Sequence, residues 1–448
     1  MRILHYALGF PPYRSGGLTK LCTDLMLQQK IEGHSVAMMW PGQLCIINKR
    51  TKIKDLGDIL LGNETVKSFE IINPLPVSLD EGIADITAYT TDVGGEAYGE
   101  LLDTFKPDVI HVHTLMGLHN SFLKASRDRK IRLVFTAHDF FPVCPKVTMY
   151  RKGKICSCVD SCEKCGVCNV TALSLKKIQL LQSSLYRILK DSFFVKKIRK
   201  RHRDGYLSDV ASDETVKPVG KPEDYQKLRE YYFGLLKQMD VIHYNSNVTK
   251  TVYESVFDLP NNHIVSITHS DIKDRRIIKK FSDNMLRIRY LGPMGGAKGF
   301  FLLKAALDEL WSEQQNFCLD VHFTPTELSP YMNVHNRYSY KDLGDIFEKT
   351  DVLVAPSILY ETFGYTVLEA LSYGVPVIIS GTVGAKDILT KGAGIIVENI
   401  TPEKLCSVFR SLTIGKLRAM NAAIVEKQPI MQIEDMTKQL EQICYGWN

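Results

Sequence analysis

Short apolar runs alternate with helical stretches along nearly the whole chain. The first unit leads from an apolar run at 1–8 through a turn at Gly16 and Gly17 to an amphipathic stretch at 18–31, and the same pattern restarts at 287. Strands of parallel sheets are apolar because both faces are buried, and the helices that connect them cover the sheet. The alternation therefore predicts an α/β fold with two halves, each built around a parallel sheet.

Interruptions of this pattern predict the domain boundaries. A first domain at 1–267 is followed by a polar linker, a second domain at 285–430 and an amphipathic helix within 431–448. Residues 144–232 are predicted to be an insertion in the first domain, because they hold a cysteine cluster and a basic stretch instead of alternating strands and helices. The length of the chain, 448 residues, suggests two to three domains, since a domain has roughly 150 residues.

The positive charge of the chain is concentrated in one segment. Lys and Arg number 56 against 50 Asp and Glu, a net charge of +6, and eight of the basic residues lie within 187–203 beside a single acid, Asp191. A local basic segment indicates a local anionic partner and argues against a protein that coats nucleic acid. The sequence has no apolar run of about 18 residues, so we expect a cytoplasmic protein without a membrane-spanning helix.

Chemistry-bearing residues follow several of the predicted strands. The Gly16-Gly17 turn opens a helix, His138 directly follows an apolar run, and a glycine-rich turn extends from Gly292 to Lys298. Ligands of open α/β sheets bind beyond the carboxyl ends of the strands, and the backbone N–H groups of a helix start bind anions. Each feature also has a plain structural interpretation, as a turn or a buried histidine. The glycine-rich turn matches neither the Walker A pattern nor GxGxxG.

The segment from Glu361 to Glu369 combines two acids with a helix start. It follows a predicted strand, and Gly364 would open the helix with free backbone N–H groups that bind a phosphate. A carboxylate on each side of the phosphate accepts hydrogen bonds from sugar hydroxyls, which suits a nucleotide sugar. The alternative is a capped helix with a solvated glutamate face, and spacing alone does not separate the two.

Taken together, these segments resemble a known enzyme family. The run ETFGYTVLEALSYGVPVI at 361–378 is similar to the Glu-x7-Glu signature of the retaining GT-B glycosyltransferases of glycosyltransferase family 4. ILHYALGFPPYRSGGLTKLCTDL resembles the family's N-terminal glycine loop. VIHVHT and LVFTAHDF resemble the strands that follow, with the active-site histidine. YLGPMGGAKGF resembles the phosphate-binding turn. The resemblance covers most of the chain apart from about 150–226.

The resemblance implies a GT-B fold, in which two Rossmann-like domains with parallel sheets face a cleft. The acceptor would bind mainly to the N-terminal domain, which carries the Cys-rich and basic insertion, and the nucleotide sugar mainly to the C-terminal domain. The helix within 431–448 would cross back to the N-terminal domain.

Roles for individual residues are implied as well. His138, Lys298 and Glu361 would be catalytic, with His138 facing the donor sugar and Lys298 neutralising the leaving diphosphate. Glu369 would hold the ribose of the donor. The donor-binding residues that the resemblance implies are Gly16, Gly17, Gly292, Lys298, Glu361, Thr362, Phe363, Gly364, Tyr365 and Glu369.

The implied reaction moves a hexose-type sugar from a UDP- or GDP-sugar to a glycan or polyprenyl-linked acceptor. It would retain the anomeric configuration and need no catalytic metal, and bacterial surface polysaccharide assembly is the usual setting. Pro293 departs from the family pattern, because an Arg commonly follows this glycine. Another cation, such as Arg289 or Arg14, would then act with Lys298. The alternatives are a non-catalytic GT-B subunit that binds a nucleotide or a partner, and a nucleotide-sugar epimerase.

Six of the eleven cysteines lie within 25 residues of one another. They are Cys144, Cys156, Cys158, Cys162, Cys165 and Cys168. Their spacing is typical of zinc knuckles, so we expect four of the six to hold a structural Zn²⁺. An iron–sulfur cluster and reduced cysteines without a metal are the alternatives. The radical-SAM activity that one of the spacings would allow does not fit the two-domain α/β pattern.

An amphipathic stretch leads directly into the basic segment. Ile178, Leu181 and Leu185 share helical spacing before 187–203. Cationic amphipathic segments bind anionic membranes, so we predict peripheral docking on the inner membrane face, near a lipid-linked acceptor. The alternative is a solvated helix packed on the domain. A zinc-knuckle nucleic-acid binder is a further alternative, which the lack of interleaved Tyr or Trp disfavours.

Overall fold

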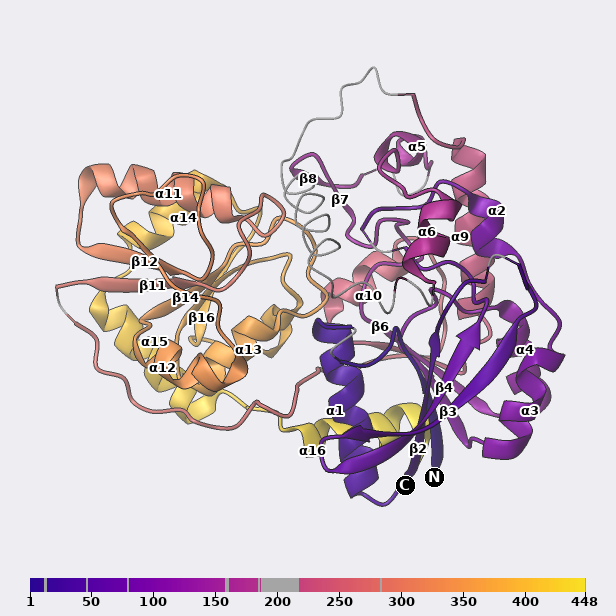
Figure 1. Cartoon of the computed structure of the whole chain (residues 1–448). Coiled ribbons are helices and arrows are strands. Elements are labelled where there is room, and N and C mark those ends of the chain that lie inside the picture. Colours follow the sequence, from indigo (N-terminus) through magenta and orange to yellow (C-terminus); the bar gives the residue numbers. More distant parts are fainter. Residues whose placement is uncertain are drawn as a thin grey trace.

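The computed structural model describes residues 1–11, 14–45, 47–78, 80–157, 161–183, 186, 217–282 and 284–447. The basic segment at 187–203, to which the membrane prediction was assigned, lies outside the described residues, as does Cys158. The described residues form two lobes, each with a central sheet (Figure 1). No helix in these ranges is long and apolar enough to cross a bilayer.

The sheet of the first lobe has eight strands in the order β10-β9-β6-β5-β1-β2-β4-β3. All neighbours are parallel except β3 and β4, which form an antiparallel hairpin at the edge. The strands are β1 (Arg2–Tyr6), β2 (Ser35–Pro41), β3 (Lys52–Leu61), β4 (Glu64–Ile72), β5 (Val109–Val112), β6 (Arg132–Ala137), β9 (Val241–Tyr244) and β10 (Asn262–Ile264). Their helices are α1 (Gly17–Ile31), α2 (Ile86–Thr90), α3 (Glu96–Phe105), α4 (Asn120–Asp128), α9 (Pro222–Leu236) and α10 (Asn247–Glu254).

Strand order reverses beside β1 in this sheet. From β1 the chain adds β2 and β4 on one side, and β5, β6 and β9 on the other. A crevice that binds ligands forms at such a switch point, outside the carboxyl ends of the strands. The reversal therefore places the residues after β1, β5 and β6 at the edge of the sheet where a site is expected.

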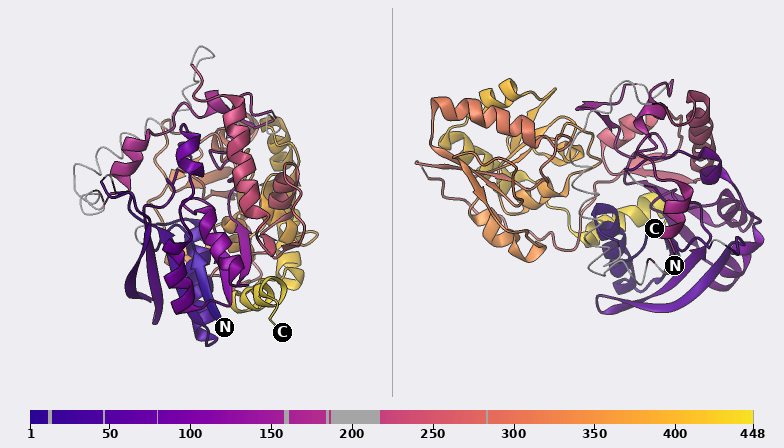
Figure 2. Two further views of the ribbon diagram at one scale, coloured as in Figure 1. Left: turned by 90° about the vertical axis from the view of Figure 1, so that its right-hand side faces the viewer. Right: turned by 45° about the horizontal axis from the view of Figure 1, so that its top comes forward.

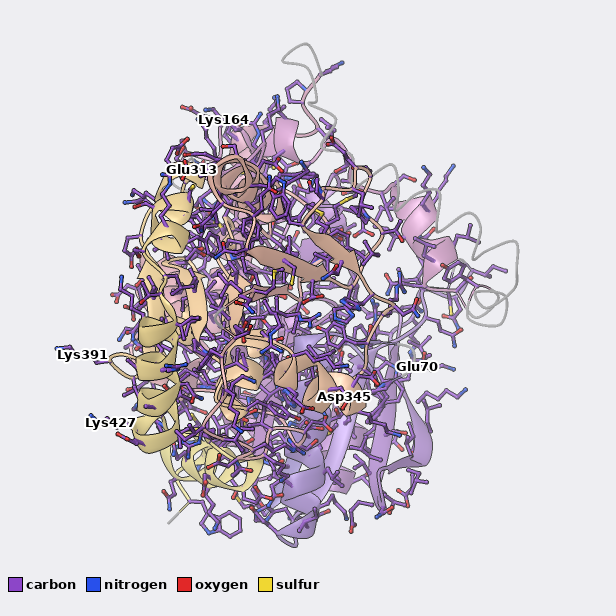
Figure 3. All side chains as sticks on the ribbon, turned by 90° about the vertical axis from the view of Figure 1, so that its left-hand side faces the viewer. Glu70, Lys164, Glu313, Asp345, Lys391 and Lys427 are labelled. Carbon is purple, nitrogen blue, oxygen red and sulfur yellow. The ribbon has the colours of Figure 1, made fainter. Side chains whose placement is uncertain are left out.

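The second lobe has a fully parallel sheet in the order β13-β12-β11-β14-β15-β16. Its strands are β11 (Leu286–Tyr290), β12 (Phe317–Val321), β13 (Met332–Val334), β14 (Val352–Ala355), β15 (Val377–Ser380) and β16 (Gly394–Val397). Its helices are α11 (Phe300–Glu313), α12 (Leu343–Glu348), α13 (Tyr365–Ser372), α14 (Pro402–Arg410) and α15 (Ile414–Lys427), with 3₁₀ turns at Tyr340–Asp342 and Gly384–Ile388. Surface side chains such as Lys391 and Lys427 point away from this lobe (Figure 3).

The last helical segment returns to the first lobe. Helix α16 (Ile433–Leu440) contacts α1, and the π-helical turn Glu441–Tyr445 contacts β6 and β9. In Figure 2 the yellow C-terminal segment lies against the first lobe. Met436 and Tyr445 are buried there in a cluster with apolar residues of β1, α1, β6 and β9, and Nε of Arg132 donates to the carbonyl oxygen of Cys444 at 2.8 Å. The chain therefore closes the first lobe with residues from its far end.

The predicted α/β class with two parallel sheets is confirmed, and the structure adds elements inside the stretch predicted as an insertion. Two short strands, β7 (Tyr150–Arg151) and β8 (Lys154–Ile155), are followed by α5 (Cys165–Cys168) and α6 (Leu175–Leu181). Most of α9 also falls within 144–232. Its residues Leu228, Tyr232 and Leu235 are buried in the core of the first lobe, so this helix covers the sheet.

Candidate active site

The glycine-rich turn before α11 packs on the loop that follows β14. Gly299 has φ +76°, and a Cβ at this position would lie 1.8 Å from the carbonyl oxygen of Pro356, so only glycine fits. The backbone N–H of Ile358 donates to the oxygen of Ala297 at 3.0 Å. These contacts hold the turn against the loop that carries Glu361.

Lys298 and Glu361 form an ion pair across this contact. Nζ of Lys298 lies 3.0 Å from Oε2 of Glu361, and the two side chains are 36% and 20% exposed. The backbone of Glu361 is anchored by bonds with Thr382 and Gly384, both at 3.0 Å. An ion pair with this exposure contributes little to folding, so both charges remain available to a ligand.

Helix α13 begins at this loop without a side-chain cap. Gly364 has φ +103° and stands at the N-cap, where a Cβ would lie 2.9 Å from Val383. The side chain of Phe363 is buried and its carbonyl oxygen accepts from the N–H of Ala385 at 2.7 Å. The backbone N–H groups at the start of an uncapped helix need acceptors, and an anion supplies them.

The glycine pair of the first lobe meets the start of α13. Gly16 has φ +108° and precedes α1 without a side-chain cap. A Cβ on Gly17 would lie 3.2 Å from Cε2 of Tyr365, so the α1 start and the ring of Tyr365 are in close contact. The first turns of two helices, one from each lobe, are thus brought together.

Glu369, the second acid of the motif, is nearly buried. Only 4% of the residue is exposed, and Oε1 lies 3.3 Å from Nε2 of His269, a buried residue of the stretch between β10 and β11. The His269 ring packs 4.9 Å from the ring of Tyr340 and 5.2 Å from that of Tyr365, between centroids. His269 is a site residue that sequence reasoning missed, because it lies in the polar stretch predicted to be the linker between the domains.

His138 of the first lobe contacts the loop that carries Glu361. Its carbonyl oxygen accepts from Oγ1 of Thr362 at 3.1 Å, and its ring Nε2 lies 2.9 Å from Nδ1 of His113. Desolvation lowers the pKa of His138 to about 3, so the ring is neutral at physiological pH. Burial raises the pKa of the neighbouring Asp139 to about 6, against the effect of the N–H of Phe141, which donates to it.

A compensating cation for Pro293 is not found at Arg289. Only 3% of this residue is exposed, and its guanidinium lies 3.4 Å from Oδ2 of Asp320 and donates to Oγ1 of Thr350 at 3.2 Å. Arg289 is therefore held on the face of the second sheet. The carbonyl oxygen of Pro293 accepts from Tyr290 at 2.9 Å, and a Cβ on Gly292 would clash with the same phenol.

The cysteines predicted to hold zinc gather around α5, as far as the structure describes them. The thiol of Cys162 lies near Cys165 and Arg229, and both lower its pKa, to about 7. Cys144 lies within electrostatic reach of Cys165 and Cys168. In the described ranges, the groups of three side chains close enough to share an ion include no cysteine, so the structure gives no support to the zinc prediction.

Two family models match parts of the chain. The model described as glycosyl transferases group 1 matches residues 272–423, which include Lys298, Glu361 and Glu369, and that described as glycosyltransferase family 4 matches residues 94–156, which include His138. The chain is a glycosyltransferase of the GT-B type. A comparison with curated protein sequences gives no significant match.

Solved GT-B structures resemble this glycosyltransferase over its whole length. Sucrose-phosphate synthase from Thermosynechococcus elongatus has a TM-score of 0.58 at 12% identity, covering 99% of this chain and 98% of that one. HepE of Anabaena in complex with UDP and glucose has a TM-score of 0.56 at 12% identity, with both chains fully covered. WaaG, a glycosyltransferase involved in lipopolysaccharide biosynthesis, has a TM-score of 0.54 at 13% identity, covering 99% of this chain and 100% of that one. At this identity the likeness shows the fold alone.

Proposed function

We propose that this glycosyltransferase moves a hexose-type sugar from a UDP- or GDP-sugar to a glycan or lipid-linked acceptor, with retention of the anomeric configuration. The observation that carries the proposal is the Lys298–Glu361 pair beside the uncapped start of α13. An ammonium and free N–H groups bind a diphosphate, and a carboxylate accepts from sugar hydroxyls. The structure of HepE with UDP-glucose supports a nucleotide-sugar donor for this fold.

The donor would lie along this loop and helix. The β-phosphate would accept from the N–H groups near Gly364 and from Lys298, which exchanges its partner Glu361 for the phosphate. Glu361 would then accept from hydroxyls of the donor sugar. Glu369 is oriented by His269 and would accept from the ribose hydroxyls. In this arrangement each charge now paired within the protein has a counterpart on the donor.

The leaving diphosphate would be stabilised mainly by electrostatics. Preorganised donors aimed at developing negative charge contribute on the order of a few kcal/mol each to lowering the barrier. With Lys298 and the α13 start in place, we propose catalysis without a divalent cation. The acceptor would attack on the face from which the diphosphate leaves, and the departing phosphate would take its proton. Retention follows from attack on that face.

Turnover with a panel of UDP- and GDP-sugars and glycan acceptors tests the proposal. We expect one donor series to be consumed in the presence of a chelator, and NMR of the product to show the donor's own anomeric configuration. An inverted product would contradict retention, and loss of turnover with the chelator would contradict metal independence. Product formed without acceptor, with the sugar epimerised, would favour the epimerase.

A non-catalytic subunit is the second candidate, and Pro293 is the observation that favours it. Turnover that falls in Glu361→Gln would exclude this candidate. Nucleotide binding without turnover, followed by a gain of turnover in Pro293→Arg, would support it.

We also propose that four of the six clustered cysteines hold a structural metal, with Zn²⁺ as the first choice and an iron–sulfur cluster as the alternative. Support comes from the spacing of the six cysteines in the sequence. Elemental analysis of protein purified without added metal tests this. We expect one Zn²⁺ per chain, lost in a double variant Cys162→Ser and Cys165→Ser. Metal-free protein with an unchanged melting temperature in that variant would contradict it.

For the acceptor we propose a lipid-linked glycan reached by docking on an anionic membrane, as in surface polysaccharide assembly. Leu180 and Leu181, at the end of α6 and before the basic segment, are 56% and 41% exposed. Flotation with anionic liposomes tests docking. Neutralising Lys196, Lys197, Arg199 and Lys200 is expected to abolish flotation, and equal flotation of both proteins would contradict it.

A further inference from the structure

A row of buried polar side chains crosses the sheet of the first lobe and ends at His138. It spans β1, β5, β6 and β9, with one member on α1 and one in the turn after α16. Seven of the members are at most 4% exposed, whereas His138 is partly exposed. In order of contact they are His138, His113, His5, Gln29, Tyr445, His111, Thr136 and His243, and the row ends at the carbonyl oxygen of Val265.

The last acceptor gives the row a direction. A backbone carbonyl oxygen only accepts, so Nε2 of His243, 2.8 Å from the oxygen of Val265, carries a hydrogen. The neutral ring then has a lone pair on Nδ1, which accepts from Thr136 at 2.8 Å. The Thr136 hydroxyl donates its one hydrogen to His243. Its oxygen therefore accepts from Nε2 of His111, at 2.6 Å.

The same reasoning continues through the C-terminal turn. Nδ1 of His111 has the lone pair and accepts from the phenol of Tyr445 at 2.7 Å. The phenol oxygen in turn accepts from Nε2 of Gln29 at 3.2 Å, which orients the amide. The amide oxygen of Gln29 is then free to accept from Nε2 of His5 at 2.8 Å. Tyr445, together with the Glu441 carboxylate that also interacts with the Gln29 side chain, therefore selects which end of the amide faces His5.

The direction of the hydrogen bonds can be followed from His5 to His138 in the candidate active site. Nδ1 of His5 accepts from Nε2 of His113 at 3.0 Å, and Nδ1 of His113 accepts from Nε2 of His138 at 2.9 Å. The row requires neutral rings, and desolvation lowers the pKa of every one of its histidines. Nδ1 of His138 is left with a lone pair.

A metal ion is the other use of such a cluster. One nitrogen each of His5, His111 and His113 lies within 4.8 Å of the others. All six ring nitrogens of these residues already have a hydrogen-bond partner within 3.0 Å. An ion would have to break the row at several points, so the geometry favours hydrogen bonding.

We propose that this row fixes His138 as the Nε2–H tautomer, so that Nδ1 accepts a hydrogen from a hydroxyl of the bound ligand. Gln29 and Tyr445 are positioning residues in this account. Gln29 acts on His138 through three successive hydrogen bonds and Tyr445 through four. Because Tyr445 belongs to the segment after α16, the tautomer depends on how that segment packs against the first lobe. The tautomer follows from the hydrogen bonds alone, whereas the hydroxyl of a donor sugar as its partner rests on the proposed function.

NMR of protein labelled with ¹⁵N-histidine tests the tautomer without any substrate. The signals of His138 are assigned by their loss in His138→Gln. At pH 7.5 we expect a protonated, pyrrole-type Nε2 and an unprotonated, pyridine-type Nδ1. The opposite pattern in the wild-type protein would overturn the proposal, and it would leave the proposed glycosyl transfer unaffected.

Two variants test whether the row sets this tautomer. Tyr445→Phe removes the hydroxyl that orients Gln29, and Gln29→Met removes the amide. In each we expect His138 to show both tautomers. Arg132→Met is the matched control, because it removes the bond to the Cys444 carbonyl and leaves every member of the row. A single unchanged tautomer in both variants, or an equal change in the control, would overturn the role of the row.

Discussion

Thr362 of the second lobe donates its hydroxyl to the carbonyl oxygen of His138 in the first, at 3.1 Å. The carbonyl oxygen of Thr362 in turn accepts from Oγ of Ser246 at 2.6 Å, again across the lobes. The side-chain hydroxyl and the backbone carbonyl of Thr362 therefore both hold the loop before α13 against the first lobe. This places the α13 start and His138 in one site.

Replacing Thr362 with valine is expected to weaken this alignment. The variant loses one hydrogen bond, worth about 1 kcal/mol, and leaves the His138 carbonyl without its donor. We expect kcat/KM for the donor to fall about fivefold to tenfold, with Thr362→Ser close to wild type. Steady-state kinetics on both variants check this, and equal losses in the two would contradict a role for the hydroxyl.

Glu361→Gln is expected to damage activity far more than stability. The pair with Lys298 is partly exposed and contributes at most about 1 kcal/mol to folding, whereas a group that contacts the reacting sugar contributes several. We expect kcat to fall at least a hundredfold and the melting temperature to stay within about 3 °C. The control is Glu309→Gln, which weakens the surface pair with Arg410 and should leave kcat unchanged. A large loss of melting temperature in Glu361→Gln would contradict the assignment.

Gly299→Ala is expected to destabilise the fold at the phosphate-binding turn. The new Cβ would meet the Pro356 carbonyl oxygen at 1.8 Å, in addition to the backbone strain of φ +76°. Gly153 provides a matched control, because it has φ +77° with no atom within 4 Å of its Cβ position. We expect about 1 to 2 kcal/mol for Gly153→Ala and at least 2 kcal/mol more for Gly299→Ala, from urea denaturation. Equal costs would show that the contact does not constrain the turn.

Stability is expected to fall steeply as the pH drops below about 6.5. Eight of the described histidines have folded-state pKa values below the usual 6.5. Between pH 6.5 and those lower values the unfolded chain therefore binds more protons than the folded chain. Each contributes up to about 1.4 kcal/mol of lost stability per pH unit. The main cause is desolvation, and the residues are His5, His34, His111, His113, His119, His138, His243 and His322.

Two acids act in the opposite direction. Burial raises the pKa of Asp139 to about 6 and that of Glu441 to about 7, so each binds a proton in the folded state first and favours folding at lower pH. The eight histidines outweigh the two acids. Urea denaturation from pH 7.5 to 5 should show decreasing stability, with a steeper decrease in Asp139→Asn. A flat profile would contradict neutral, buried rings.

The elements that the sequence predicted well are those buried on both faces. Strand β1 and the strands β14 and β15 are nearly continuous apolar runs, and Gly364 and Gly299 mark the helix starts that follow such strands. The β3–β4 hairpin was missed because most of β3 is exposed and lacks an apolar face. Helix α9 was assigned to the insertion because its buried tyrosines and leucines are separated by charged residues.

The polar row shows what sequence reading could not reach. His138 was recognisable because it follows a strand. His5 lies within β1 and pairs in register with His111 of β5, and Thr136 pairs with His243, so these contacts exist only once the sheet order is known. Gln29 and Tyr445 are 416 positions apart and meet through the packing of α16 on α1.

Thermal unfolding with UDP, GDP, ADP or no nucleotide, compared between wild type and Glu369→Gln, tests the donor-binding claim most directly. A ligand that binds only the folded state raises the midpoint of unfolding. At a ligand concentration a hundred times its Kd, the free energy of unfolding rises by about 2.7 kcal/mol. The account predicts a rise with UDP or GDP that is lost or strongly reduced in the variant. No rise with any nucleotide, or an equal rise in Glu369→Gln, would contradict the placement of a nucleotide sugar at α13.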